Sequence, residues 1–397
     1  MSEAAELRKI RICRWCLGRL HSSDAGSVEA VGSKIASELG IGTDDAGCQL
    51  CGGMFSRLGE LVEGALDGLA GLELRSFYVS VSVPFEMREA EDELRSRLRL
   101  RGGLSAKRLA IRMISREIER RLGVPASPRN PDAILEFTPE GLRAISLMPM
   151  YLEGRYVKPA EEPAGGPGGL EGEVTRSLAA ALAADEVRMI WLGTDFEGIE
   201  VAGRGRPFLA KVLGARRRIS WPRALGGALG DRVLSLRALG DPRAVSGLAG
   251  RRAYDVVLVE AEAPSAPEDL DSRLRALEGS EIRCGGGSPR RVARALGRAE
   301  GGYLIALICV EHGVDPRLLP ECVAGGGRAS RALVLDVVED CAGYPLGWYA
   351  AGLKKDNFPG APVRAWPDAS GAGLSGGSSS TSRTPSGSAR PSSTTPS

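Results

Sequence analysis

Hydrophobic residues recur along the chain in two different periods, which predicts a fold that contains both helices and strands. In residues 26–41 apolar side chains return at helical spacing, and in residues 75–84 they alternate with polar ones, as in a half-buried strand. Helical spacing also marks three further basic or mixed segments and one later apolar segment, residues 57–71, 88–100, 105–123 and 174–184. Strand patterns mark residues 132–138, 142–152, 186–193 and 208–213. The pattern leaves the second half of the chain open as an α/β or an α+β unit, and for the whole chain we expect the α+β class.

Composition agrees with a folded protein and sets the number of domains. The 397 residues are 43% hydrophobic and 26% charged, and a length of about 150 residues per domain predicts two or three domains. No apolar run reaches the roughly 18–20 residues that a membrane helix needs, so we expect no membrane partner. The first residues lack the basic and apolar regions of a secretory signal, so we expect a cytoplasmic protein.

Two low-complexity stretches interrupt this pattern. Residues 159–173 are rich in proline and glycine and are predicted to form an interdomain linker. From residue 346, and most clearly from Pro367, the chain becomes a tail rich in serine, glycine and proline. Such a tail cannot bury enough apolar surface to fold, so we expect it to be disordered.

Four of the eight cysteines form two Cys-x-x-Cys pairs, Cys13 with Cys16 and Cys48 with Cys51. A two-residue spacer lets both sulfurs face one ion, and two such pairs complete a tetrahedron. We therefore predict a structural Zn²⁺ site with four thiolates and no open position for catalysis. The other four cysteines are scattered, and a reducing compartment disfavours disulfides between them. They are Cys284, Cys309, Cys322 and Cys341.

The predicted helix at 105–123 carries a row of cations away from its apolar stripe. The chain has 52 basic and 50 acidic residues, so its net charge does not indicate nucleic-acid binding. Only a cluster of basic residues can indicate it. One interpretation is a surface that contacts RNA phosphates, and the other is a solvated face with ion pairs to Glu117 and Glu119. The cations that we single out as candidate RNA-binding residues are Lys107, Arg108, Arg112 and Arg116.

Candidate catalytic residues lie between Trp191 and Arg218. A strand ends there in a turn that contains Asp195, and a second turn with Arg204 and Arg206 precedes the strand at 208–213. A carboxylate among arginines is ionised, a state suited to nucleophilic attack or to work as a base. The other interpretation of Asp195 is a turn residue whose side chain caps the backbone.

Several ordered motifs together resemble the archaeal and eukaryotic tRNA pseudouridine synthases that modify uridines in the T-arm. The family's opening Cys-x-x-Cys-Leu-Gly-Arg motif is similar to Cys13–Arg19, and its Gly-Arg-Pro-Phe motif to Gly205–Phe208. The remaining matching segments are Leu152–Lys158, Gly250–Glu262, the stretch from Ser288 and the stretch from Leu335. The resemblance covers about residues 8 to 340.

The resemblance implies an architecture for each part of the chain. It implies a zinc-stapled, THUMP-like RNA-binding N-terminal part followed by a pseudouridine synthase domain with a mixed sheet. The implied boundaries are 1–57 for the four-cysteine zinc module, 58–158 for the THUMP-like domain, 159–173 for the linker, 174–345 for the catalytic domain and 346–397 for the tail.

The resemblance also implies a chemistry. The family's catalytic Asp follows Gly-x-Glu, whereas the ungapped alignment from Gly205 puts Phe196 at that position and Asp195 one residue before it. If the alignment is shifted by one residue, Asp195 serves as the nucleophile on a flipped-out uridine. Without that shift, the chain lacks the catalytic carboxylate. The resemblance further implies that Tyr254 stacks on the base, that Arg206 or Arg204 holds a phosphate or the carboxylate, and that Tyr303 is a weaker match to a second aromatic.

Two functions of different class follow from these observations. The first is a tRNA pseudouridine synthase that uses no organic cofactor, and the alternative is a catalytically inert relative that binds tRNA. The glycine-rich runs lack Walker or Rossmann spacing, which argues against a nucleotide cofactor and against a methyltransferase. His21 and His312 form neither a triad nor a metal pair in the sequence, and we assign them no role.

Overall fold

A computed structural model describes residues 3–192, 194–218, 232–239, 253–262, 270–300, 302–324, 329–342, 344 and 346. All of them belong to one compact unit within Met1–Asn357. Apart from Leu346, the tail predicted at 346–397 lies outside the described residues. None of the helices in the described ranges has the length and hydrophobicity needed to span a membrane.

The N-terminal region is helical and packs around the four paired cysteines. Its helices are α1 (Glu3–Leu7), α2 (Arg14–His21) and α3 (Val28–Leu39). Helices α2 and α3 approach so closely that a Cβ atom on Gly18 would overlap the carbonyl oxygen of Val28, and one on Gly32 would overlap that of Arg14. Only glycine permits so close an approach of the two helices.

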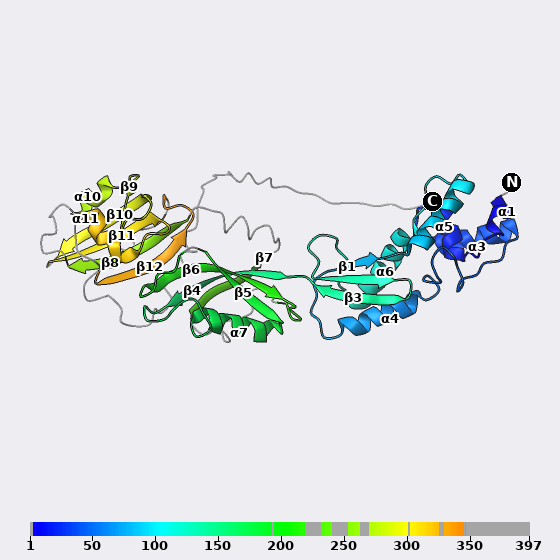
Figure 1. The fold of residues 1–397 in the computed structure, drawn as a ribbon, viewed down its shortest axis with the longest axis horizontal. Helices are drawn as coiled ribbons and strands as arrows, with labels where there is room; N and C mark the ends of the chain where they lie inside the picture. The colour runs from blue at the N-terminus through cyan, green and yellow to red at the C-terminus, as the bar shows by residue number, and fades with distance from the viewer. Residues whose placement is uncertain are drawn as a thin grey trace, which may run out of the picture. The chain divides into compact units, whose positions relative to one another are not determined.

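A small sheet follows, with helices packed on it (Figure 1). The sheet has the order β1-β2-β3, with β1 and β2 parallel and β2 and β3 antiparallel. Side chains of β1 alternate between buried and half-buried, which confirms the strand predicted at residues 75–84. The elements are α4 (Leu58–Leu69), β1 (Phe77–Val81), α5 (Phe85–Arg97), α6 (Ala106–Leu122), β2 (Ala133–Thr138) and β3 (Gly141–Leu147).

The basic helix α6 begins and ends as its sequence predicts. The side chain of Ser105 accepts a hydrogen bond from the Arg108 N–H, and Gly123 ends the helix with a left-handed φ of 67°. Ile114 and Ile118 are buried, whereas Leu122 is exposed, so the apolar stripe is shorter than predicted. The four candidate RNA-binding cations are all exposed.

The described residues after β3 build a nine-stranded mixed sheet (Figure 1). Its order is β7-β4-β6-β12-β8-β11-β10-β9, and β5 also pairs with β6. The strands are β4 (Met150–Lys158), β5 (Glu186–Trp191), β6 (Glu200–Leu213), β7 (Val233–Leu239), β8 (Tyr254–Glu262), β9 (Glu281–Ile282), β10 (Arg290–Glu300), β11 (Tyr303–Glu311) and β12 (Arg331–Val338). The accompanying helices are α7 (Leu170–Leu182), α10 (Leu270–Ala276), α11 (Leu319–Ala324) and the 3-10 helix η2 (Pro316–Leu318). The two mixed sheets with their helices confirm the α+β class.

Strand β4, which the expected boundaries place in the N-terminal part, pairs with strands of the large sheet. The sequence pattern placed residues 142–152 in one strand of the N-terminal half, but β3 ends at Leu147 and β4 pairs with β6 and β7 of the large sheet. The Pro/Gly-rich stretch therefore connects β4 to α7 inside the large-sheet region, and α7 already begins at Leu170. Periodicity locates strands, but it does not show which sheet each one joins.

The second turn expected at Gly203–Phe208 is also wrong, because β6 runs without a break from Glu200 to Leu213. Gly203 and Gly205 have φ values of 61° and 72°. Their left-handed conformation bends the strand, and the pairing of β6 with β12 shifts register close by, between Val334 and Asp336. The glycines thus shape a continuous strand and do not reverse the chain.

The four scattered cysteines are paired, contrary to the expectation from a reducing compartment. Cys284 bonds to Cys322 across 5.7 Å between Cα atoms, and Cys309 bonds to Cys341 across 6.5 Å. The partners are 38 and 32 residues apart, so their spacing in the sequence gave no sign of the pairing.

Candidate active site and metal centre

A cluster of charged side chains gathers where the central strands of the large sheet end. Asp195 comes from the loop between β5 and β6, Arg206 from β6, and Lys158 from the last position of β4. Asp255 is the second residue of β8, and His312 follows β11, whose end pairs with the start of β8. Antiparallel pairing therefore brings residues that are far apart in the sequence to one edge of the sheet.

Two cations hold the carboxylate of Asp195. Its Oδ1 lies 3.5 Å from Nη1 of Arg206, and its Oδ2 lies 3.6 Å from Nζ of Lys158. The side chain of Asp195 is 19% exposed, whereas those of Arg206 and Lys158 are 3% and 0% exposed. The carboxylate is thus the part of this group that solvent, or a substrate, can reach.

Lys158 is fixed by the backbone as well as by Asp195. Its Nζ donates hydrogen bonds to the carbonyl oxygens of Glu162 at 3.0 Å and Ile199 at 2.9 Å. With the carboxylate of Asp195, these carbonyls give the buried ammonium group three oxygen partners, one for each of its N–H donors. Lys158 therefore contributes a fixed positive charge beside Asp195.

Asp195 and Phe196 point into different surroundings. Asp195 meets the two cations, whereas Phe196 packs against an apolar cluster that includes Ile199 and Val257. Of the two residues, Asp195 is therefore the one placed to do chemistry.

A second buried carboxylate, Asp255, extends the cluster. Its Oδ1 lies 3.4 Å from Nη2 of Arg206, and its Oδ2 lies 2.7 Å from Nδ1 of His312. The backbone N–H of Thr194 donates a hydrogen bond to Nε2 of the same histidine. Arg206 therefore bridges two carboxylates, and His312 connects the second of them to the residue before Asp195.

Tyr156 lies beneath this cluster as a neutral phenol. Burial, and after it the negative charge of Asp195, raises the pKa of Tyr156 above that of a free phenol. Its ring meets that of Trp191 edge to face, with centroids 5.2 Å apart, and lies 6.3 Å from that of Phe208. These aromatic contacts pack β4 against β5 and β6 under the Asp195 loop.

The remaining predicted residues lie in different places. Tyr254 is half-buried at the first position of β8, directly before Asp255, and its assignment as the stacking residue stays a prediction. Tyr303 pairs with Glu262 at the other end of β8, on the order of 25 Å away along the strand. Arg204 is 3.7 Å from the carboxylate of Asp336. The structure therefore brings Arg206 to Asp195, and it brings neither Tyr303 nor Arg204.

Sequence reasoning missed Lys158, Asp255 and His312 as members of the cluster. Lys158 stands in the motif Leu152–Lys158, and Asp255 directly precedes the apolar run Val256–Val259, which is a signal for a buried acid with a partner. His312 has no local signal, because its partners are 57 and 118 residues away in the chain.

The four paired cysteines form a cluster that could hold a metal ion. All four are buried, and their sulfurs lie within 4.8 Å of one another. Sγ of Cys13 and Sγ of Cys51 are 3.7 Å apart. Sulfurs bound at about 2.3 Å to one tetrahedral ion stand about 3.8 Å apart, so the spacing fits the donor set.

Arg19 connects this cluster to helix α5. Its buried guanidinium donates from Nε to Sγ of Cys16 at 3.3 Å, and its Nη1 lies 2.8 Å from Oε1 of Glu91. Burial opposes ionisation of Glu91, but Arg19 and Arg95 outweigh it and lower the pKa of that carboxyl. The arginine of the Cys-x-x-Cys-Leu-Gly-Arg motif thus donates to a cysteine sulfur and joins the four-cysteine cluster to the next helix.

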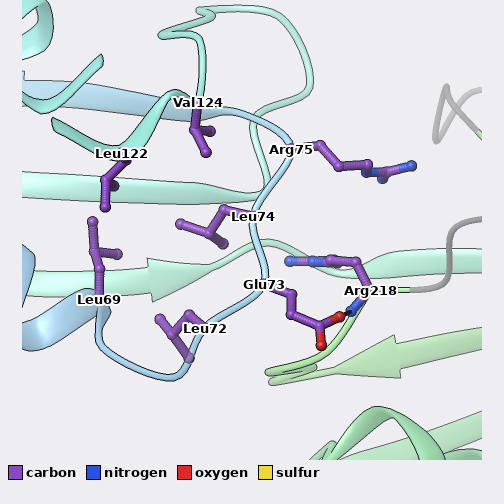
Figure 2. Close-up of a pocket in the computed structure, with 8 residues that line it drawn as sticks. All are labelled: Leu69, Leu72, Glu73, Leu74, Arg75, Leu122, Val124 and Arg218. Atoms are coloured by element: carbon purple, nitrogen blue, oxygen red, sulfur yellow. Dashed lines mark hydrogen bonds between the residues drawn. The ribbon is translucent and has the colours of Figure 1, made fainter. Parts of the chain in front are cut away.

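A separate cavity of about 430 Å³ lies away from both sites (Figure 2). Apolar side chains cover one side of it, and Arg218 donates from its backbone to Oε2 of Glu73 at 2.9 Å on the other. It is lined by Leu69, Leu72, Glu73, Leu74, Arg75, Leu122, Val124 and Arg218. None of the predicted catalytic or metal-binding residues contributes to it.

Comparison with known proteins gives one consistent group of relatives. No family model matches the sequence. The "tRNA pseudouridine synthase Pus10" of Cenarchaeum symbiosum is 28% identical over 312 residues, which cover 72% of this chain and 75% of that protein. Its counterpart in Caldivirga maquilingensis is 26% identical over 68% of this chain and 73% of that protein. The chain is similar in sequence to these archaeal proteins named Pus10.

Other similarities are shorter or more distant. The Pus10 protein of Pyrococcus furiosus is 28% identical, and the match covers 53% of this chain and 58% of that protein. Among solved structures, the archaeal box H/ACA sRNP Nop10–Cbf5 complex aligns with 46% of this chain at 16% identity and a TM-score of 0.27. The similarity to the Pus10 proteins therefore rests on the sequence matches.

Proposed function

We propose that this chain is a tRNA pseudouridine synthase that isomerises uridine in the T-arm. The observation that carries the proposal is the partly exposed carboxylate of Asp195, held between the buried cations of Arg206 and Lys158. The similarity to proteins named tRNA pseudouridine synthase supports the same reaction. Such enzymes are isomerases and need no organic cofactor.

The reaction replaces one bond from uracil to ribose with another. The bond from N1 to C1′ breaks, the detached uracil turns, and C5 bonds to C1′ while the C5 proton is released and N1 gains a proton. The carboxylate of Asp195 would attack C1′ or stabilise the positive charge that forms there, once the uridine has flipped out of the RNA stack. Arg206 and Lys158 each lie beside one of its two oxygens and would hold them in place.

The other residues of the proposal bind substrate or metal. Tyr254 would stack on the flipped base, and its position beside Asp255 supports that role. The four cysteines would bind Zn²⁺ as a structural ion, because four buried thiolates leave no position for a substrate. The N-terminal part that contains α6 would bind the folded tRNA by its shape and phosphates.

Neutralising the exposed cations of α6 is expected to weaken tRNA binding and to reduce its dependence on salt. Each lost phosphate contact should lower the slope of log K against log salt concentration by about 1. The variant combines Lys107→Gln, Arg108→Gln, Arg112→Gln and Arg116→Gln, and binding is measured by titration at several salt concentrations.

The matched control is Arg120→Gln on the same helix. Arg120 is engaged by Glu117, whose Oε2 accepts from its Nε at 3.0 Å, so this variant should keep the wild-type slope. An unchanged slope in the fourfold variant would show that α6 is a solvated face without phosphate contacts.

The proposed function is tested on an unmodified tRNA transcript. The wild-type chain is incubated with the transcript, and pseudouridine is mapped by chemical labelling and primer extension. Stops in the T-arm that need active protein support the proposal, and stops elsewhere would support the reaction but not the site. Intact tRNA binding without any product would instead support an inert relative.

A further inference from the structure

The loop that carries Asp195 is tied to a residue that the reaction itself does not use. The backbone N–H of Thr194 donates to Nε2 of His312, which is 118 residues further along the chain. Thr194 directly precedes Asp195, so this hydrogen bond anchors the loop backbone one residue before the proposed nucleophile. His312 is itself anchored, because its own N–H donates to the carbonyl oxygen of Ala253 at 2.9 Å.

The two ring nitrogens of His312 face different partners. Nδ1 lies 2.7 Å from Oδ2 of Asp255 and 3.5 Å from Nη2 of Arg206. Nε2 accepts the hydrogen bond from the N–H of Thr194. The imidazole therefore connects the buried carboxylate on one side to the backbone of the Asp195 loop on the other.

These contacts form a closed network that begins and ends at the Asp195 loop. Asp195 meets Arg206, Arg206 meets Asp255, and Asp255 meets His312, which returns to Thr194. The side chains of Arg206 and Asp255 are 3% and 2% exposed, so these two members of the network are shielded from water. Both the carboxylate of Asp195 and the backbone before it are therefore held by one connected network.

We infer that His312 is a positioning residue that orients Asp195 through the backbone of Thr194. The inference rests on the proposed function, because it concerns the same carboxylate. Displacement of a catalytic group by about 1 Å can lower a rate about 100-fold, so a single hydrogen bond at this place matters. Since His312 acts through the loop and not on the substrate, its loss should lower kcat and leave KM unchanged.

Three substitutions of His312 distinguish its contact with Asp255 from its hydrogen bond with Thr194. His312→Gln reaches far enough to place an amide oxygen near the Nε2 position, so it keeps an acceptor for Thr194. His312→Asn keeps a donor near the Nδ1 position for Asp255 but has no atom that reaches Thr194. His312→Leu removes both and fills a similar volume.

For each variant, pseudouridine formation on the tRNA transcript is measured as kcat and KM, and hydrogen exchange is measured at the amide of Thr194. We expect kcat of His312→Gln to lie within about fivefold of wild type, and kcat of the Asn and Leu variants to fall about 10- to 100-fold. KM should stay constant, and the Thr194 amide should exchange faster in the Asn and Leu variants only.

The inference would be overturned if kcat fell equally in the Gln and Asn variants. It would also be overturned if the fall in kcat followed the loss of thermal stability and not the loss of the acceptor for the Thr194 N–H. Wild-type kcat in His312→Leu would overturn it too. An inactive wild-type chain would contradict the proposed function instead, and the exchange at Thr194 would still decide whether His312 holds the loop. Faster exchange in His312→Leu but not in His312→Gln supports the inference in that case, and unchanged exchange in all three variants overturns it.

Discussion

Asp195→Asn is expected to abolish pseudouridine formation in the T-arm. The substitution keeps the size of the side chain and removes the charge and the nucleophilic oxygen, and loss of a covalent nucleophile lowers rates on the order of 10⁴-fold or more. Binding of tRNA should persist, because the phosphate-binding cations proposed on α6 are unchanged. The measurement is single-turnover product formation, with primer extension to locate the product.

The matched control for this substitution is Phe196→Leu at the next position. Phe196 packs against apolar residues and not against Arg206 or Lys158, so the variant should lose some stability and keep its product. Thermal melting of both variants shows whether they remain folded. Product formation by a folded Asp195→Asn variant would show that the nucleophile is not Asp195. A folded Phe196→Leu variant without activity would show that the apolar packing at position 196 is required as well.

Removal of the metal is expected to unfold the N-terminal cysteine module. The four sulfurs are buried within 4.8 Å of one another, and structural zinc sites contribute about 10–16 kcal/mol of folding free energy in small modules. We expect one bound zinc ion per chain by elemental mass spectrometry, and a loss of helical circular dichroism and of tRNA binding when a strong chelator is added.

Cys48→Ser should reproduce the effect of the chelator, and Cys284→Ser provides the control. Cys48 belongs to the metal cluster, whereas Cys284 lies in the large-sheet region and pairs with Cys322. Cys284→Ser should therefore keep its zinc. Full zinc content in Cys48→Ser, or a chelated chain that melts like the wild type, would contradict the structural role of the metal.

The features predicted correctly from sequence depend on near neighbours in the chain. The caps of α6 at Ser105 and Gly123 lie within the helix's own turns, and the Cys-x-x-Cys pairs bring their sulfurs together through a local turn. The alternation in β1 is likewise local. Each of these depends on backbone geometry over a few residues, which the order of residue types determines.

The features that were missed depend on which segments meet. The sequence pattern of strand β4 is compatible with either the small or the large sheet. Only its pairing with β6 and β7 shows that it belongs to the large sheet. Gly203 and Gly205 signal a turn by composition, yet the neighbouring strands extend β6 through them. His312 comes close to Asp255 and the Asp195 loop only because the end of β11 pairs with the start of β8.

The central claim is that this chain isomerises uridine, and release of the C5 hydrogen tests it most directly. A tRNA transcript labelled with tritium at C5 of its uridines must lose tritium to water whenever C5 bonds to C1′. We expect the wild-type chain to release tritium in proportion to the pseudouridine formed, and Asp195→Asn to release none. Complete retention of tritium by a wild-type chain that binds the transcript would contradict the account.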